Sequence, residues 1–190
     1  MMLLLKQMIE VYWNMLCFKR SPLDTPDSSM MLSIAVGLSL LMSLGQLSLS
    51  YSLGKVSLPY WASICMIVIQ LMLAFGYTRF ILWTQNKLNC WQRMITCWMM
   101  MLFMLDGFAF LFMLMIFLLH TMGFIVILQK AIIFLSVVVG IILSFWQISF
   151  SIRLYRIFMN QALWFAVGVY LGWFGLNFLL LSFFRTLFKV

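Results

Sequence analysis

Asp106 and Gln70 are polar side chains inside long apolar stretches of this sequence. Asp106 lies near the middle of the stretch 94–119, and Gln70 lies within the stretch 60–84. A charged group inside a membrane costs several kcal/mol, so an acid at such a depth marks a candidate site for an ion, a proton or a hydrogen-bonded partner. Burial also favours the protonated form of a carboxyl group. Asp106 is therefore the first candidate functional residue.

Lys130 is the candidate counter-charge, in the apolar stretch after the one that holds Asp106. A tight hairpin centred near residues 121–122 would place Asp106 opposite residue 137. Lys130 would then lie about 10 Å away along the helix axis, at 1.5 Å per residue. We therefore expect Lys130 to extend outward and Asp106 to meet Gln70 or a neighbouring chain.

Small and polar residues mark two helix faces for packing. Ser39, Ser43, Gln46 and Ser50 are spaced by four, three and four residues, which places them on one stripe of a helix. Such a stripe is expected to face other helices and not lipid. Gly168 and Gly172 form a small-xxx-small pair, with Gly175 in the next turn. This face favours close packing within the chain over dimerisation.

The sequence contains no catalytic or metal-binding motif. HExxH, GxSxG and phosphate-loop patterns are absent, and no second acid accompanies Asp106 within an apolar stretch. The one histidine, His120, is predicted in a turn, and the four cysteines show no CxxC spacing. We therefore expect no enzyme activity, no catalytic or cofactor-binding residue, no metal site and no cofactor.

The elements that position these residues follow from the composition. Of 190 residues, 66% are hydrophobic and 8% are charged, whereas soluble domains carry about 25% charged residues. A bilayer core needs about 20 apolar residues in helical conformation. We predict an all-α integral membrane protein, whose domain 30–190 is a bundle of five transmembrane helices. The predicted spans are 30–52, 60–84, 94–119, 124–150 and 161–184.

Residues 1–20 are predicted to form an amphipathic helix in the membrane interface. Its apolar face is Leu4, Met8, Val11, Tyr12, Met15 and Leu16, and its polar face is Lys6, Gln7, Glu10 and Asn14. A linker, 21–29, follows, and its two prolines hold the chain extended. The linker is interpreted either as a recognition loop or as a rigid corner before the first span. Asp27, Ser28 and Ser29 offer N-cap oxygens for that span.

The basic residues predict the orientation. With the N-terminus inside, the inner side holds eight Lys and Arg residues and the outer side holds three, which satisfies the positive-inside rule. The inner group is Lys6, Lys19, Arg20, Arg79, Lys87, Arg93, Arg153 and Arg156; the outer group is Lys55, Arg185 and Lys189. These basic residues are spread between apolar runs, so we expect lipid and no nucleic acid as their partner.

The pattern Arg20-x-Pro22-x-Asp24-x-Pro26-x-Ser28 after an apolar helix resembles an uncharacterised family of small proteobacterial inner-membrane proteins. The basic loops around Lys87 and Arg153 look similar too. That family is similar in layout to the Yip-type (Rab-interacting) five-span membrane proteins. The resemblance implies a multi-pass protein of the bacterial inner membrane with a membrane-organising or assembly role, and it implies no catalytic residues.

Two functions follow as expectations. The first is a non-enzymatic assembly factor, scaffold or accessory subunit that binds other integral membrane proteins or a second copy of itself. The second is a small transporter or channel, with Asp106, Gln70 and the Ser39–Ser43–Gln46 face lining a path. A scaffold needs a packed interior, whereas a transporter needs several polar faces that converge on one cavity.

Overall fold

The computed structural model describes residues 10–15, 17–54, 58–121 and 126–188, with the side chains of residues 120 and 126–130 excepted. Within these ranges all regular structure is helical. Each of five helices is long and apolar enough to cross a membrane, which confirms the prediction of five such helices. The helices are α2 (Ser29–Ser52), α3 (Tyr60–Thr84), α4 (Trp91–Thr121), α5 (Val126–Met159) and α6 (Leu163–Phe188).

Helix α5 continues nine residues beyond its predicted end at residue 150, up to Met159. No Pro or Gly interrupts residues 151–159. The helix ends where Asn160 adopts a left-handed conformation, with φ at 51°, a common way to terminate a helix. With 34 residues, α5 is about 51 Å long and exceeds a hydrocarbon core of about 30 Å. The additional turns carry Arg153 and Arg156, which suit a position outside that core.

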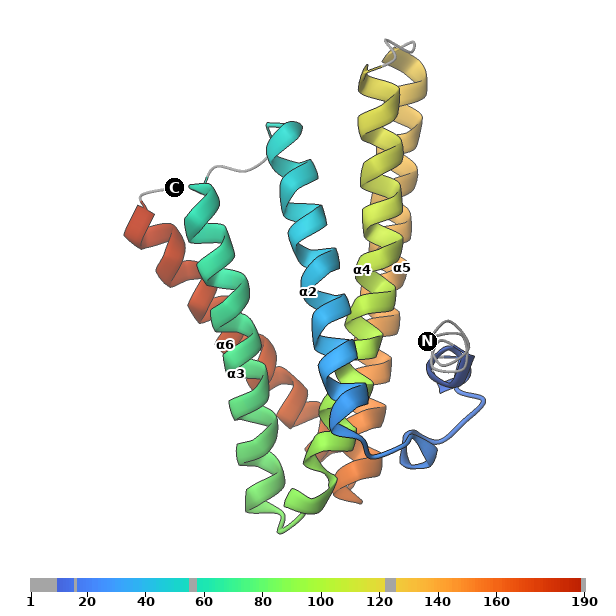
Figure 1. Cartoon of the computed structure of the whole chain (residues 1–190), viewed down its shortest axis with the longest axis vertical. Helices are drawn as coiled ribbons and strands as arrows, with labels where there is room; N and C mark the ends of the chain where they lie inside the picture. Colours follow the sequence, from blue (N-terminus) through green and yellow to red (C-terminus); the bar gives the residue numbers. More distant parts are fainter. Residues whose placement is uncertain (1–9, 16, 55–57, 122–125, 189–190) are drawn as a thin grey trace.

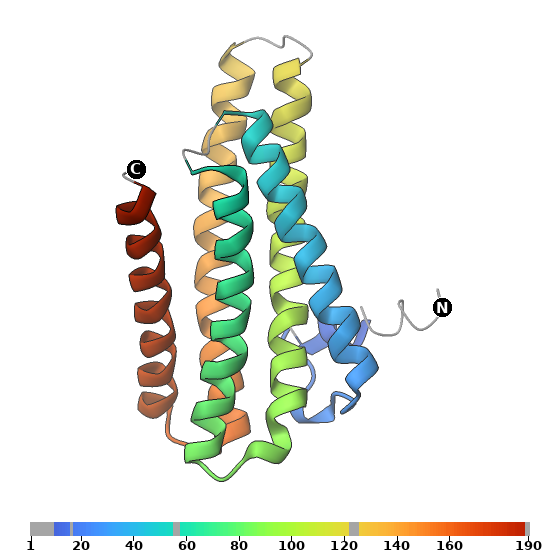
Figure 2. The same ribbon diagram turned by 60° about the vertical axis from the view of Figure 1, so that its left-hand side comes forward.

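The five helices come together at the end of the bundle that holds the α3–α4 connection (Figure 1). From there α6 leans away from α4 and α5, and the α4–α5 hairpin reaches beyond the other helices at the opposite end (Figures 1 and 2). The buried core lies near the joined end. Every residue from 94 to 101 in α4 is buried, as are Phe150, Leu154 and Phe158 in α5. A helix that is apolar and buried on all sides is one that neighbours surround.

The N-terminal segment packs against protein, and an interfacial helix over residues 1–20 is not confirmed. Residues 10–15 are helical. Tyr12 and Met15, predicted to face lipid, are fully buried in the core cluster with α4 and α5. Leu4, Met8 and Leu16, predicted on the same face, lie outside the described residues. The apolar face therefore has a protein partner in its described part, because α4 and α5 offer an apolar surface beside it.

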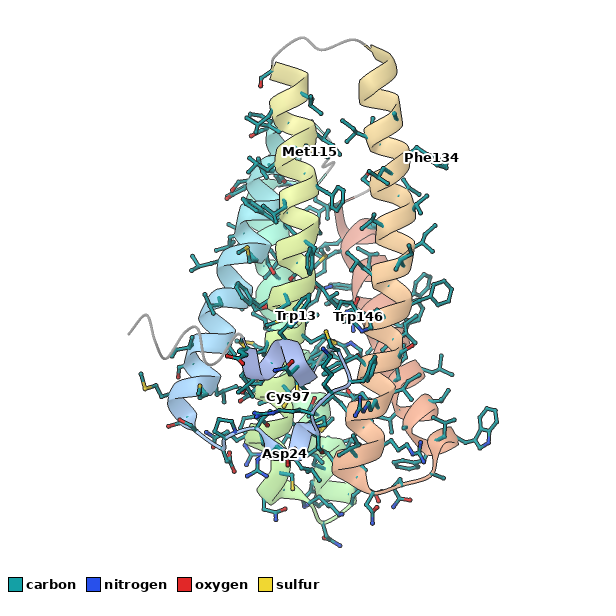
Figure 3. All side chains as sticks on the ribbon, turned by 90° about the vertical axis from the view of Figure 1, so that its right-hand side faces the viewer. Trp13, Asp24, Cys97, Met115, Phe134 and Trp146 are labelled. Carbon is teal, nitrogen blue, oxygen red and sulfur yellow. The ribbon has the colours of Figure 1, made fainter. Side chains whose placement is uncertain are left out.

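Aromatic contacts hold this segment on the hairpin. Trp13 lies 6.2 Å from Phe108 and 6.5 Å from Trp146 between ring centroids. Figure 3 shows Trp13 beside Trp146, with the segment lying across α4 and α5. The Arg153 guanidinium lies 4.7 Å from the ring centroid of Phe18, which is a cation–π distance. The segment is thus attached at several points along one side of the hairpin.

The linker forms a compact corner on α4. A short 3-10 helix, η1 (Pro22–Asp24), is followed by Thr25, which is buried. The Thr25 hydroxyl donates to the carbonyl of Pro22 at 2.7 Å and lies 3.3 Å from the Cys97 sulfur. Arg93 donates to the carbonyl of Leu23 at 3.1 Å. Ser28 is the N-cap of α2, but its side chain makes no capping hydrogen bond, contrary to expectation.

Candidate functional site

The serine and glutamine stripe of α2 lies along α4. The Gln46 amide donates to the backbone carbonyl of Asp106 at 2.6 Å, and the Ser43 side chain lies beside the Asp106 carboxyl group. The Ser50 hydroxyl lies 3.9 Å from the sulfur of Met113. The helices approach closely here because Gly45 has no side chain: a Cβ at this position would lie 3.0 Å from the ring of Phe110. The stripe therefore positions polar groups around Asp106.

A half-open cavity of about 720 Å³ lies among the five helices, and the stripe lines one wall of it. Asp106 and the residues Ser39, Ser43, Gln46 and Ser50 all contribute to this wall. The volume falls within the range of about 300–1,000 Å³ that is usual for small-molecule sites.

The remaining helices contribute polar groups from the other sides. Ser63 and Gln70 come from α3, Ser144 and Gln147 from α5, and Tyr170 and Asn177 from α6. The structure therefore brings together Asp106, Gln70 and the Ser39–Ser43–Gln46 face that the sequence singled out. Within the described residues, the amides of Gln70 and Gln147 have no protein hydrogen-bond partner and are available to a ligand.

Aromatic side chains line the cavity toward the joined end of the bundle. The rings of Trp98 and Trp173 meet edge to face with centroids 5.0 Å apart, and Tyr77 lies 5.8 Å from Trp173. The Tyr77 hydroxyl donates to the carbonyl of Val169 at 2.6 Å, which joins α3 to α6. At the opposite end the lining reaches Leu58, in the α2–α3 connection. The lining of the cavity therefore extends from these aromatic rings to the α2–α3 connection.

The turn of the α4–α5 hairpin lies later in the sequence than predicted. Asp106 lines the same cavity as Ser144 and Gln147. Lys130 lies in the first turns of α5, and its side chain is outside the described residues; its position is 14 residues from Ser144, or about 21 Å along the helix. The predicted turn at residues 120–123 is displaced, because α4 continues to Thr121 and α5 begins at Val126.

The two glycines predicted to pack have different surroundings. A Cβ at Gly172 would lie 2.6 Å from the Tyr77 hydroxyl, so this glycine makes room for α3. A Cβ at Gly168 would meet nothing within 4 Å. Of these two glycines, Gly172 thus lies where a neighbouring helix packs closely, and Gly168 does not.

In the linker, Pro22 is buried, whereas Arg20, Asp24 and Pro26 are exposed.

Several lining residues were not predicted from the sequence. Gln147, Asn177 and Ser144 are isolated polar residues in apolar helices, and Ser144 and Gln147 share a helix face at a spacing of three. That spacing was an available signal. No such signal exists for Trp98 and Trp173, because a tryptophan at the membrane interface and one in the core cannot be distinguished from sequence alone. Comparison with known protein families, with curated proteins and with solved structures gives no match for this chain.

Proposed function

We propose that the chain is a non-enzymatic multi-pass membrane protein that binds a small polar solute in the cavity, as a small transporter does. One observation carries this proposal: polar side chains from all five apolar helices converge on one half-open space around Asp106. Polar groups in membrane helices are costly and mark solute or ion paths. A protein that serves only as a scaffold needs no such cavity.

The proposed location is the bacterial inner membrane, with the N-terminus cytoplasmic and the C-terminus periplasmic. The described basic residues support this orientation: Arg79, Lys87, Arg93, Arg153 and Arg156 all fall near the end that holds the α3–α4 connection, and Arg185 falls near the other end. A C-terminal alkaline phosphatase fusion is expected to be active. An inactive phosphatase fusion, with a fluorescent protein active at the same site, would contradict the orientation.

Cysteine accessibility tests whether the cavity holds water. In a variant with Cys17, Cys65, Cys90 and Cys97 replaced by Ala, Ser43→Cys is treated with a membrane-impermeant methanethiosulfonate reagent on intact cells. The matched control is Leu41→Cys, two residues away on the exposed side of α2. The Ser43→Cys variant is expected to react and the Leu41→Cys variant to stay unmodified, because a thiol in hydrocarbon does not ionise. Equal protection of both cysteines would refute a water-filled cavity.

A second candidate function is an assembly factor or accessory subunit that binds other membrane proteins. The long α4–α5 hairpin favours it, since Met115 and Phe134 are exposed apolar side chains in its upper part (Figure 3). A photo-crosslinking residue at either position would capture a partner protein if this function holds. Crosslinks to lipid alone would leave solute binding as the better proposal.

A further inference from the structure

The charges around the cavity are unbalanced. Asp106 is the one acidic side chain in the lining, and no Lys, Arg or His lines the cavity within the part of the chain that the structure describes. Its partners are neutral: the Ser43 side chain on the carboxyl group and the Gln46 amide on its backbone carbonyl. A carboxylate in a membrane is strongly favoured by a cation beside it. The side of Asp106 that lines the cavity therefore suits a positively charged group.

Below Asp106 the same wall turns apolar and aromatic. Trp98, Leu102 and Asp106 follow one another at a spacing of four on α4, and all three line the cavity. The eight residues from Trp98 to Asp106 rise about 12 Å. Trp173 and Phe174 of α6 extend the aromatic surface, and Trp faces attract organic cations. The wall thus offers a carboxyl group at one level and an apolar surface within reach of one small molecule.

We infer that the solute is a small organic ammonium ion, whose charged nitrogen pairs with Asp106 and whose apolar part lies over Leu102 toward Trp98 and Trp173. This inference rests on the proposed solute-binding function and names the class of its substrate. The amides of Gln70 and Gln147 offer further hydrogen bonds to polar groups on the same molecule.

Two other cation sources fit less well. A bare metal ion needs a tight set of ligands, and within the described ranges no three His, Cys, Asp or Glu side chains come together. An ethanolamine lipid headgroup carries the same ammonium chemistry, but its phosphate would bring a negative charge near Asp106, where the described lining has no basic residue. Neither objection applies to a free amine, which needs no set of metal ligands and carries no phosphate.

Calorimetric titration of the purified full-length protein in detergent tests the inference with matched probes. The probe is 2-phenylethylammonium, and 2-phenylethanol is its neutral analogue of similar size. The wild-type protein is expected to bind the amine about ten- to hundredfold more tightly, which is the range of a charge-assisted hydrogen bond. Asp106→Asn is expected to remove this preference, while Asp106→Glu keeps it. Asp24→Asn, an exposed acid outside the cavity, is the control and is expected to leave the preference unchanged.

The outcomes separate the inference from the proposed function. Equal binding of amine and alcohol to the wild-type protein would overturn the ammonium assignment, and a reactive Ser43→Cys variant would keep the polar-solute function. Absence of binding together with an unreactive Ser43→Cys variant would overturn both. Mass spectrometry of the purified protein distinguishes the source: an ethanolamine lipid retained by the wild type and lost in Asp106→Asn would overturn the free-amine assignment. The wild-type comparison requires no variant, so a misfolded substitution does not prevent the test.

Discussion

Replacing Gly172 by Ala tests how α3 and α6 are joined. The new Cβ would lie 2.6 Å from the Tyr77 hydroxyl, which donates to the carbonyl of Val169 at 2.6 Å. The tyrosine ring must therefore move and its interhelical hydrogen bond must break. Gly168→Ala is the matched control, because a Cβ there meets nothing within 4 Å. Both substitutions gain the same helix propensity, so their difference isolates the contact with Tyr77.

The expected difference in the free energy of unfolding between the two variants is the sum of a few contributions. Gly→Ala gains about 0.5–1 kcal/mol in a helix interior. An interhelical hydrogen bond in a membrane protein contributes about 0.6 kcal/mol, with a maximum near 1.7, and displacing the ring that packs on Trp173 adds about 1 kcal/mol. Gly168→Ala is therefore expected to stabilise the protein, and Gly172→Ala to be about 1.6–2.7 kcal/mol less stable than that control.

Unfolding by SDS titration in mixed micelles measures this difference, and a double-mutant cycle checks its cause. Tyr77→Phe removes the hydroxyl, and the next ring atom lies 3.6 Å from the position that the new Cβ would take, an ordinary contact. In the Tyr77→Phe background, Gly172→Ala should then behave as Gly168→Ala does. An equal cost of Gly172→Ala in both backgrounds would refute this account of the α3–α6 contact.

Three further predictions concern buried polar groups. The Tyr12 hydroxyl is buried without a hydrogen-bond partner among the described residues. Tyr12→Phe is therefore expected to stabilise the docked N-terminal segment by about 1 kcal/mol. Limited proteolysis should then cleave the segment more slowly, and faster cleavage would contradict this prediction. Burial, and then the nearby Cys97, raise the pKa of Tyr12 above its ordinary value. The Tyr12 hydroxyl therefore keeps its proton to a higher pH in the docked form than in the free form. Docking should weaken above about pH 10 by up to about 1.4 kcal/mol per pH unit, and Tyr12→Phe should reduce this dependence. Asp106→Asn is expected to unfold as the wild type does, whereas Asp106→Leu, which loses the polar contact with Ser43, should cost about 1–2 kcal/mol in the same SDS titration.

The five helices were predictable because each is a long apolar run, and the cost of unpaired backbone groups in lipid leaves helix as the form such a run takes. Helix ends were less predictable where no Pro or Gly marks them. Hydropathy alone ends the fourth span at residue 150, yet α5 continues to Met159, and the left-handed backbone of Asn160 then ends it. Hydropathy thus indicates where an apolar segment ends, and this need not be where the helix ends.

The cavity was predictable in part. The spacing of Ser39, Ser43 and Gln46 indicated a helix-facing stripe, and the structure places that stripe beside Asp106. The lengthwise register of α5 against α4 was not predictable, because it depends on how two apolar surfaces interlock, which leaves no periodic signal. The spacing of Ser144 and Gln147 indicates a shared helix face but does not say which part of α4 lies beside it, so both were missed as lining residues of the cavity. Likewise, the amphipathic pattern around Tyr12 records an apolar face but not whether lipid or protein covers it.

The docking of the N-terminal segment has a consequence for the order of biosynthesis. Phe18 is made about 130 residues before its partners Phe150 and Arg153. At roughly 5–20 residues per second, this delay is on the order of 7–30 s. During that time Tyr12 and Met15 have no α4–α5 surface to cover them. An amphipathic sequence suits this waiting period, because the membrane surface can shelter its apolar face until the hairpin has been inserted.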